Sequence, residues 1–166
     1  MVLPLLTRID HIGIACRDLD RAVALYQATF GLEVASLEVN EEQGVREAML
    51  RVGTDARTAV ATAGPAASRA LTPALAGVRP GYVQLLEPLA PDTPVGRFIA
   101  RRGEGLHHVG YGVSDIGQAL ATVAGTGIRL IDERPRHGSM GASISFLHPA
   151  DLGGVLTELV QAARPS

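Results

Sequence analysis

The chain opens with an alternation of apolar and small residues that predicts a β-strand over residues 8–16. Its apolar face carries Ile12, Ile14 and Cys16, whereas the opposite face carries His11, Gly13 and Ala15. The histidine has open space around its ring, because glycine and alanine have no bulky side chains. Such space is what a ligand or substrate pocket requires.

The layout of this strand is repeated 97 residues later. In both copies a histidine is followed after two residues by a glycine and after seven by an aspartate that can cap a helix. The histidines are His11 and His108, and the aspartates are Asp18 and Asp115. A match over this many positions indicates two related modules. If the modules pair symmetrically, the two histidines face each other.

Each copy is followed by the pattern of a helix and three further strands. In the first module we predict a helix from Asp18 to Phe30 and strands at residues 32–39, 45–52 and 82–89. In the second we predict a helix from Asp115 to Gly127, strands at 128–132, 142–147 and 155–160, and a flexible turn at 136–141. A short helix at 92–101 joins the modules.

These elements predict an α+β fold in a single domain, residues 1–166. Two βαβββ modules, residues 8–89 and 105–161, are expected to form a curved half-barrel sheet around a metal-binding cleft. Residues 54–80 interrupt the first module and are rich in Ala, Gly, Thr and Pro. We expect this segment to be a surface loop, with at most one helical turn at 66–75.

The composition narrows the range of functions. The net charge is −2, without a basic run, and this argues against nucleic acid as a partner. The single cysteine excludes an internal disulfide, and no stretch reads as a signal peptide or membrane span, so we expect a cytoplasmic protein. The chain contains no lysine, which removes Schiff-base and pyridoxal enzymes from the candidates.

The two repeated histidines are candidates for a metal site, and the closing strands of the modules add two oxygen donors. Gln84 precedes two apolar residues as Glu158 does, so both occupy comparable places in their modules. With His11 and His108 they form a mixed nitrogen and oxygen set that leaves room for two waters or a bidentate substrate. Such a set suits Co²⁺, Mn²⁺, Zn²⁺, Mg²⁺ or Fe²⁺, and donor hardness alone does not choose among them.

Several stretches resemble the methylmalonyl-CoA epimerases of the vicinal-oxygen-chelate superfamily, which also holds glyoxalases, bleomycin-resistance proteins and dioxygenases. They are RIDHIGIACRDLDRAV, NEEQGVREAML, YVQLLEPL, GEGLHHVGYGVSDI, IDERPRHGSMGASISFLHP and GVLTELV. The first and fourth are shared loosely across the superfamily, whereas NEEQGVREAML, GSMG, FLHP and GVLTELV are more specific to the epimerases. The resemblance covers most of the chain except residues 54–80, and it implies the paired-module fold.

The resemblance also implies a site and a reaction. The metal ligands fall on His11, Gln84, His108 and Glu158, the four residues that the repeat selects, and the catalytic carboxylate falls on Glu47. The implied cofactor is a divalent ion, Co²⁺ before Mn²⁺, Zn²⁺, Mg²⁺ or Ni²⁺, and the implied assembly is a homodimer. The implied substrate is methylmalonyl-CoA, inverted at C2 through a metal-stabilised enolate thioester.

In this reaction a proton leaves C2 and another returns on the opposite face. Glu47 is the predicted base on one face, and Glu158 or a bound water is the predicted carrier on the other. His107 is predicted to be structural or to support the neighbouring ligand. The backbone of residues 139–141 is a candidate for holding the thioester or carboxylate, and Arg136 for meeting a CoA phosphate.

Two other functions compete with epimerisation. A glyoxalase or ring-cleaving dioxygenase of the same fold is the enzymatic alternative, and a metal-free protein that sequesters a small drug is the other. Dioxygenases use two histidines and one carboxylate and leave a position open for O₂, so a fourth protein ligand, Gln84, argues against them. Drug-binding members generally lack the ligands, and all four are retained here.

Overall fold

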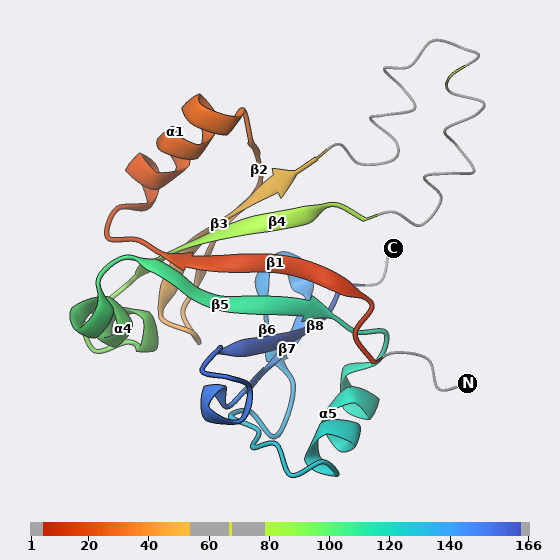
Figure 1. Ribbon diagram of the computed structural model, residues 1–166. Helices are drawn as coiled ribbons and strands as arrows, with labels where there is room; N and C mark the ends of the chain where they lie inside the picture. Colours follow the sequence, from red (N-terminus) through yellow and green to blue (C-terminus); the bar gives the residue numbers. More distant parts are fainter. Residues whose placement is uncertain (1–4, 54–66, 68–78, 164–166) are drawn as a thin grey trace.

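The computed structural model describes residues 5–53, 67 and 79–163 (Figure 1). The first module contains β1 (Arg8–Ala15), α1 (Leu19–Phe30), β2 (Glu33–Asn40), β3 (Val45–Val52) and β4 (Gly81–Pro88). The helix α4 (Pro94–Arg102) leads to the second module. This module contains β5 (Gly105–Gly112), α5 (Ile116–Ala124), β6 (Arg136–His137), β7 (Ser143–Leu147) and β8 (Thr157–Gln161), with 3₁₀ turns at Ser139–Gly141 and Pro149–Asp151.

The strands form one curved, eight-stranded mixed sheet in the order β2-β3-β4-β1-β5-β8-β7-β6, which confirms the predicted curved half-barrel of paired modules. The first strands of the two modules, β1 and β5, pair antiparallel at the centre of the sheet (Figure 1). Each of them pairs in parallel with the last strand of its own module, β1 with β4 and β5 with β8. The arrangement therefore repeats about the junction between β1 and β5.

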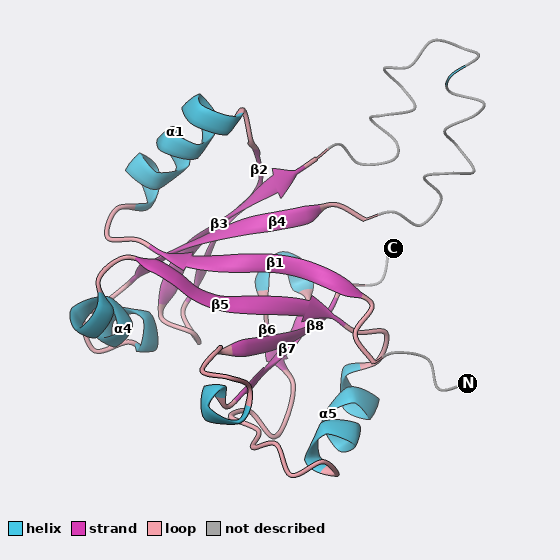
Figure 2. Cartoon of the chain, viewed as in Figure 1, coloured by secondary structure: helices cyan, strands magenta, loops and turns pink. Residues whose placement is uncertain are grey.

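The aspartates of the repeat begin the two outer helices. Asp18 accepts a hydrogen bond from the backbone N–H of Arg21 at 2.9 Å, and Asp115 accepts one from Gln118 at 2.8 Å. Helices α1 and α5 then cover the convex face of the sheet, each packing on its own module (Figure 2). The core is correspondingly divided, with Leu85 central to one cluster and Leu159 to the other.

The second module differs from the sequence prediction in two places. The strand predicted at 128–132 is wrong, because this segment makes only an isolated bridge, Leu130 to Leu147. The side chain of Asp132 accepts the backbone N–H of Phe146 at 2.9 Å, which replaces a ladder bond. The flexible turn predicted at 136–141 is also wrong, since it contains β6 and a 3₁₀ turn in which Met140 has φ of 56°.

The concave side of the sheet is closed at one end. Helix α4 packs through Val95 and Ile99 against Ala15, Val45 and Leu86. By strand alternation these three residues share a face with His11, Glu47 and Gln84. Helix α4 therefore covers the cleft where β1 ends, and the cleft remains open where β1 begins, at Arg8.

The two edge strands of the sheet are brought together across the cleft. Gln43, in the turn between β2 and β3, donates a hydrogen bond to the carbonyl of His137 at 3.3 Å. The backbone N–H of Met140 donates to Glu38 at 3.1 Å, and Arg136 pairs with Glu42 at 2.8 Å. These contacts close the half-barrel across the concave face of the sheet.

Among the helices of the described residues, none combines the length and the apolarity that crossing a membrane would need. The predicted loop at 54–80 and its helical turn at 66–75 fall almost wholly outside the described residues.

Candidate active site

The antiparallel pairing of β1 and β5 explains why a glycine follows each repeated histidine by two residues. His11 lies opposite Gly110, and His108 lies opposite Gly13. A Cβ atom on Gly110 would lie 2.4 Å from Cε1 of His11, and one on Gly13 would lie 2.1 Å from Cε1 of His108. Each histidine ring therefore occupies the space left by the glycine of the other module.

Replacing Gly13 by alanine is expected to displace the His108 ring and weaken metal binding. Steric overlap of this kind costs about 1–3 kcal/mol of stability in well-packed interiors. Ion content per chain after dialysis and the unfolding free energy measure the two effects. Gly117→Ala is the matched control, because its Cβ would come no closer than 3.4 Å to Asp115 and alanine favours a helix. Full metal retention in Gly13→Ala would contradict this packing.

Each histidine is preceded by a residue that sits in a β-bulge. The register between β1 and β5 skips Asp10 on one strand and His107 on the other. As a result Asp10 Oδ1 lies 3.1 Å from Nδ1 of His11, and His107 Nδ1 lies 3.0 Å from Nδ1 of His108. The two bulged residues therefore support equivalent rings, one through a carboxylate and the other through an imidazole.

The parallel pairs bring the remaining two donors to the same place. Gln84 lies beside Gly13, and Glu158 lies beside Gly110. Nε2 of His11 lies 3.0 Å from Nε2 of His108 and 2.8 Å from Oε2 of Glu158. The third separation, His108 Nε2 to Glu158 Oε2, is 3.5 Å.

These separations fit a divalent ion. Donor atoms held about 2.0–2.2 Å from one ion are roughly 3–3.5 Å apart. Oε1 of Gln84 is buried without a hydrogen-bond partner among the described residues, and such burial is costly for a polar atom unless a cation satisfies it. His11, His108 and Glu158 are the cluster of three ionisable donors, and Gln84 supplies a fourth, neutral oxygen.

The charges at this centre also favour a cation. Burial alone would raise the pKa of Glu158, but contacts with His108 and His11 outweigh it and lower that pKa to about 2. Burial would lower the pKa of His11, yet Asp10 and Glu158 raise it to about 9. Without an ion the buried carboxylate is thus balanced by a proton on His11, and binding a metal would release that proton.

Glu47 is connected to one of the candidate metal donors, Gln84, through a hydrogen bond. Its side chain is buried, and Nε2 of Gln84 donates to its Oε2 at 2.7 Å. The hydroxyl of Ser139 donates to its Oε1 at 2.8 Å. Burial raises the pKa of Glu47 above its usual range, although these two hydrogen bonds counteract part of the effect. A carboxylate in such a setting is suited to accept and return a proton.

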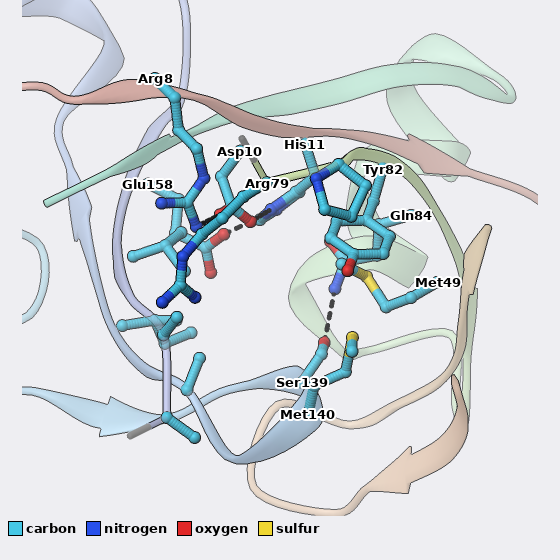
Figure 3. Close-up of a pocket in the computed structure, with 16 residues that line it drawn as sticks. Arg8, Asp10, His11, Met49, Arg79, Tyr82, Gln84, Ser139, Met140 and Glu158 are labelled. Carbon is cyan, nitrogen blue, oxygen red and sulfur yellow. Dashed lines mark hydrogen bonds and ion pairs between the residues drawn. The ribbon is translucent and has the colours of Figure 1, made fainter. Parts of the chain in front are cut away.

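A cavity of about 200 Å³ gives a ligand access to three of the four candidate metal donors. His11, Gln84 and Glu158 line it, together with Ser139 and Met140 from the 3₁₀ turn (Figure 3). The figure shows the side chains of both modules pointing into the same space. Arg8, Arg79 and Tyr82 lie on the side where β1 and β4 begin.

All five predicted site residues, His11, Glu47, Gln84, His108 and Glu158, are therefore buried together on the concave side of the sheet. Two contacts were missed in the sequence. Asp10 stands 97 residues before His107, so the repeat could have revealed it. The hydroxyl of Ser139 carries no such signal, because only the meeting of the sheet edges brings it to Glu47.

Comparison with known proteins identifies relatives along nearly the whole chain. The glyoxalase/bleomycin resistance protein/dioxygenase superfamily matches residues 10–146. A methylmalonyl-CoA epimerase solved with methylmalonyl-CoA and NH4+ is 47% identical, with a TM-score of 0.79, over 95% of this chain and 96% of that one. A Streptomyces coelicolor epimerase variant solved with 2-nitronate-propionyl-CoA is 46% identical, with the same TM-score and coverage.

A curated relative extends the match to animals. The human mitochondrial methylmalonyl-CoA epimerase is 30% identical over 158 residues, which are 95% of this chain and 75% of the human protein. The superfamily match and the identities agree with the paired-module architecture and with the stretches that the sequence singles out. The chain therefore belongs to the methylmalonyl-CoA epimerase family of the glyoxalase/bleomycin resistance protein/dioxygenase superfamily.

Proposed function

We propose that this protein inverts the configuration at C2 of methylmalonyl-CoA through an enolate. The observation that carries the proposal is the hydrogen-bonded connection from the buried Glu47, through Gln84, to a cluster of metal donors. The relatives, which are epimerases acting on this class of thioester, support the same reaction. The reaction needs a base beside a centre that stabilises negative charge, and Glu47 lies directly behind Gln84 and Ser139, which line the cavity.

His11, His108, Glu158 and Gln84 would hold the divalent ion. In this position the ion would supply Lewis-acid stabilisation of the charge that develops on the thioester oxygen. Asp10 and His107 fix the two imidazole rings from behind, and this support orients their Nε2 atoms toward the centre. Burial lowers the pKa of His107 to about 4, so its ring is neutral at pH 7.

Two carboxylates are available for the two faces of C2. Glu47 extends from β3 in the first module and Glu158 from β8 in the second. We propose Glu47 as the base that removes the proton, held in place by Ser139 and Gln84. Glu158 after it has taken a proton from a bound water, or that water itself, returns a proton on the other face, and inversion follows because the proton is removed from one face of C2 and returned to the opposite one.

The competing functions fit the site less well. A ring-cleaving dioxygenase needs three ligands and a free position for O₂, whereas Gln84 adds a fourth donor with an unsatisfied buried oxygen. A metal-free binding protein would leave Oε1 of Gln84 buried without a partner among the described residues. Co²⁺ remains our first choice of ion, before Mn²⁺, Zn²⁺, Mg²⁺ or Ni²⁺.

Deuterium uptake at C2 of methylmalonyl-CoA in D₂O tests the proposed function directly. The metal-loaded protein is expected to incorporate deuterium and to racemise a single epimer of the substrate. Treatment with a chelator is expected to abolish both, and restoring the ion is expected to recover them. Absence of exchange with every candidate ion would refute the proposal.

We also propose that the protein is a homodimer and that it is cytoplasmic. Ile9, Ile12 and Leu106 are exposed on β1 and β5, between the helices of the two modules (Figure 1). Apolar residues left open on central strands are typical of a surface that a second copy covers. The lone buried cysteine agrees with a reducing compartment.

A further inference from the structure

Two carboxylates occupy directly opposite positions on β2 and β3, namely Glu38 and Glu47. Residues that face each other in a ladder lie on the same side of the sheet, and here Glu38 is half-buried while Glu47 is buried. Like charges at such positions repel each other and lower stability. A costly arrangement of this kind is typical of a functional site rather than of a structural one.

The 3₁₀ turn at Ser139–Gly141 is held by both carboxylates. The hydroxyl of Ser139 donates to Oε1 of Glu47 at 2.8 Å, and the backbone N–H of Met140 donates to Oε1 of Glu38 at 3.1 Å. The hydroxyl of Ser36 donates to the same oxygen of Glu38, which fixes this carboxylate from its own strand. Glu38 therefore connects the edge strand of the first module to the turn that carries Ser139.

The conformation of the turn explains why it needs an acceptor from outside. Met140 has φ of 56°, in the left-handed region that a side chain disfavours, and Gly141 follows with φ of 72°. The N–H of Met140 belongs to the first turn of a helical segment, where N–H groups have no partner within the segment. A carboxylate that accepts this N–H through a charge-assisted hydrogen bond thus stabilises a backbone that is locally unfavourable.

The position of the turn also determines the position of the Ser139 hydroxyl. This hydroxyl accepts a hydrogen bond from Nε2 of Gln84 at 2.9 Å and donates one to Glu47 (Figure 3). It therefore lies between the proposed base and a candidate metal donor. Because Met140 is the next residue in the chain, losing the hydrogen bond to Glu38 would loosen both contacts of Ser139.

We propose that Glu38 is a positioning residue, which holds the 139–141 turn so that Ser139 fixes the carboxylate of Glu47 for proton abstraction. The inference rests on the proposed function, in which Glu47 is the base. Glu38 is not among the described residues that line the cavity, so it acts through the turn and not by touching the substrate. The competing explanation is that Glu38 only helps to close the sheet edges, as the ion pair between Arg136 and Glu42 does.

Three substitutions at Glu38 separate its reach from its charge. Glu38→Gln keeps an oxygen that can accept the Met140 N–H, Glu38→Asp keeps the charge but is one methylene shorter, and Glu38→Ala lacks both. Deuterium exchange at C2 is compared on its high-pH plateau, where Glu47 is ionised in every variant. Glu38→Gln is expected to match the wild type. Glu38→Asp and Glu38→Ala are expected to lower kcat about tenfold, the effect of losing one hydrogen bond to a charged group.

A double-variant cycle with Ser139→Ala tests whether the effect passes through the turn. If Glu38 acts through Ser139, adding Glu38→Ala to Ser139→Ala is expected to lower kcat by less than about twofold further. Glu42→Ala is the matched control, because it removes another contact between the sheet edges, the 2.8 Å ion pair with Arg136, and leaves the Met140 N–H bonded. This control is expected to keep the kcat of the wild type.

Hydrogen exchange of the Met140 amide, followed by NMR, reports on the turn without catalysis. Exchange is expected to be about tenfold faster in Glu38→Asp and Glu38→Ala than in the wild type, and close to the wild type in Glu38→Gln. Equal protection in all variants would overturn the inference, as would independent effects of Glu38→Ala and Ser139→Ala on kcat or an equal loss in Glu42→Ala. Absence of deuterium exchange in the wild type would refute the proposed function instead, and the amide measurement would still decide whether Glu38 holds the turn.

Discussion

Glu47→Gln is expected to lose deuterium exchange at C2 by roughly 10²–10⁴-fold, the range typical of a positioned general base. The substitution keeps the shape of the side chain and removes its ability to accept a proton. The amide can still receive a hydrogen bond from Gln84 or Ser139, so the fold and the cavity are expected to persist. Exchange is measured in D₂O with saturating substrate and a fixed ion concentration.

Two controls make this result specific to the base. Bound ion per chain is expected to match the wild type, because the contact of Glu47 with the proposed metal ligands, among the described residues, is the hydrogen bond from the amide nitrogen of Gln84. Ser139→Ala removes one hydrogen bond to Glu47 and leaves its carboxylate, so it is expected to have a smaller effect than Glu47→Gln. Exchange near the wild-type rate in Glu47→Gln would move the role of the base to Glu158 or a water.

His108→Ala is expected to abolish metal binding. The variant loses one donor of the three whose atoms lie within 4.8 Å of one another, and it leaves Glu158 with a single imidazole partner. In the wild type an ion at 100 times its Kd adds about 2.7 kcal/mol to stability, because it binds only the folded state. That increment is expected to vanish in the variant.

Thermal unfolding with and without added Co²⁺ measures this difference. His137→Ala is the matched control, because the His137 ring is exposed and only its backbone carbonyl takes part in the contacts with Asn40 and Gln43. The control is expected to keep the full metal-dependent rise in Tm. A rise of the same size in His108→Ala would show that the ion binds elsewhere.

The repeat explains why the sequence predicts so much of this fold. Both histidines, both capping aspartates and the positions of Gln84 and Glu158 follow from one alignment of the chain with itself. Once the first strands of the modules pair, symmetry brings the four donors to one place. Periodicity within strands and helices supplies the rest, since each module buries one face of its sheet.

The features that escape prediction arise where local pattern and tertiary structure disagree. Strict alternation turns Asp10 and His107 away from the site, but bulges in β1 and β5 return both to the histidines. Residues 128–132 have the composition of a strand. However, the backbone N–H of Phe146 donates to the side-chain carboxylate of Asp132, whereas in a β-ladder it would donate to a backbone carbonyl. Ser139 reaches Glu47 only because the sheet curls until its edges meet, a long-range event without a local signal.

The exchange of space between the histidine of one module and the glycine of the other constrains how the two halves can diverge. A side chain larger than hydrogen at Gly13 would displace the ring of His108, which lies 95 residues away in the sequence. In the same way, a larger side chain at Gly110 would displace the ring of His11. Each module therefore contains the glycine that makes room for the histidine of the other module. We expect a chimaera that joins modules from two relatives to keep the geometry of this site only when both modules retain glycine at these positions, however well their helices and loops match.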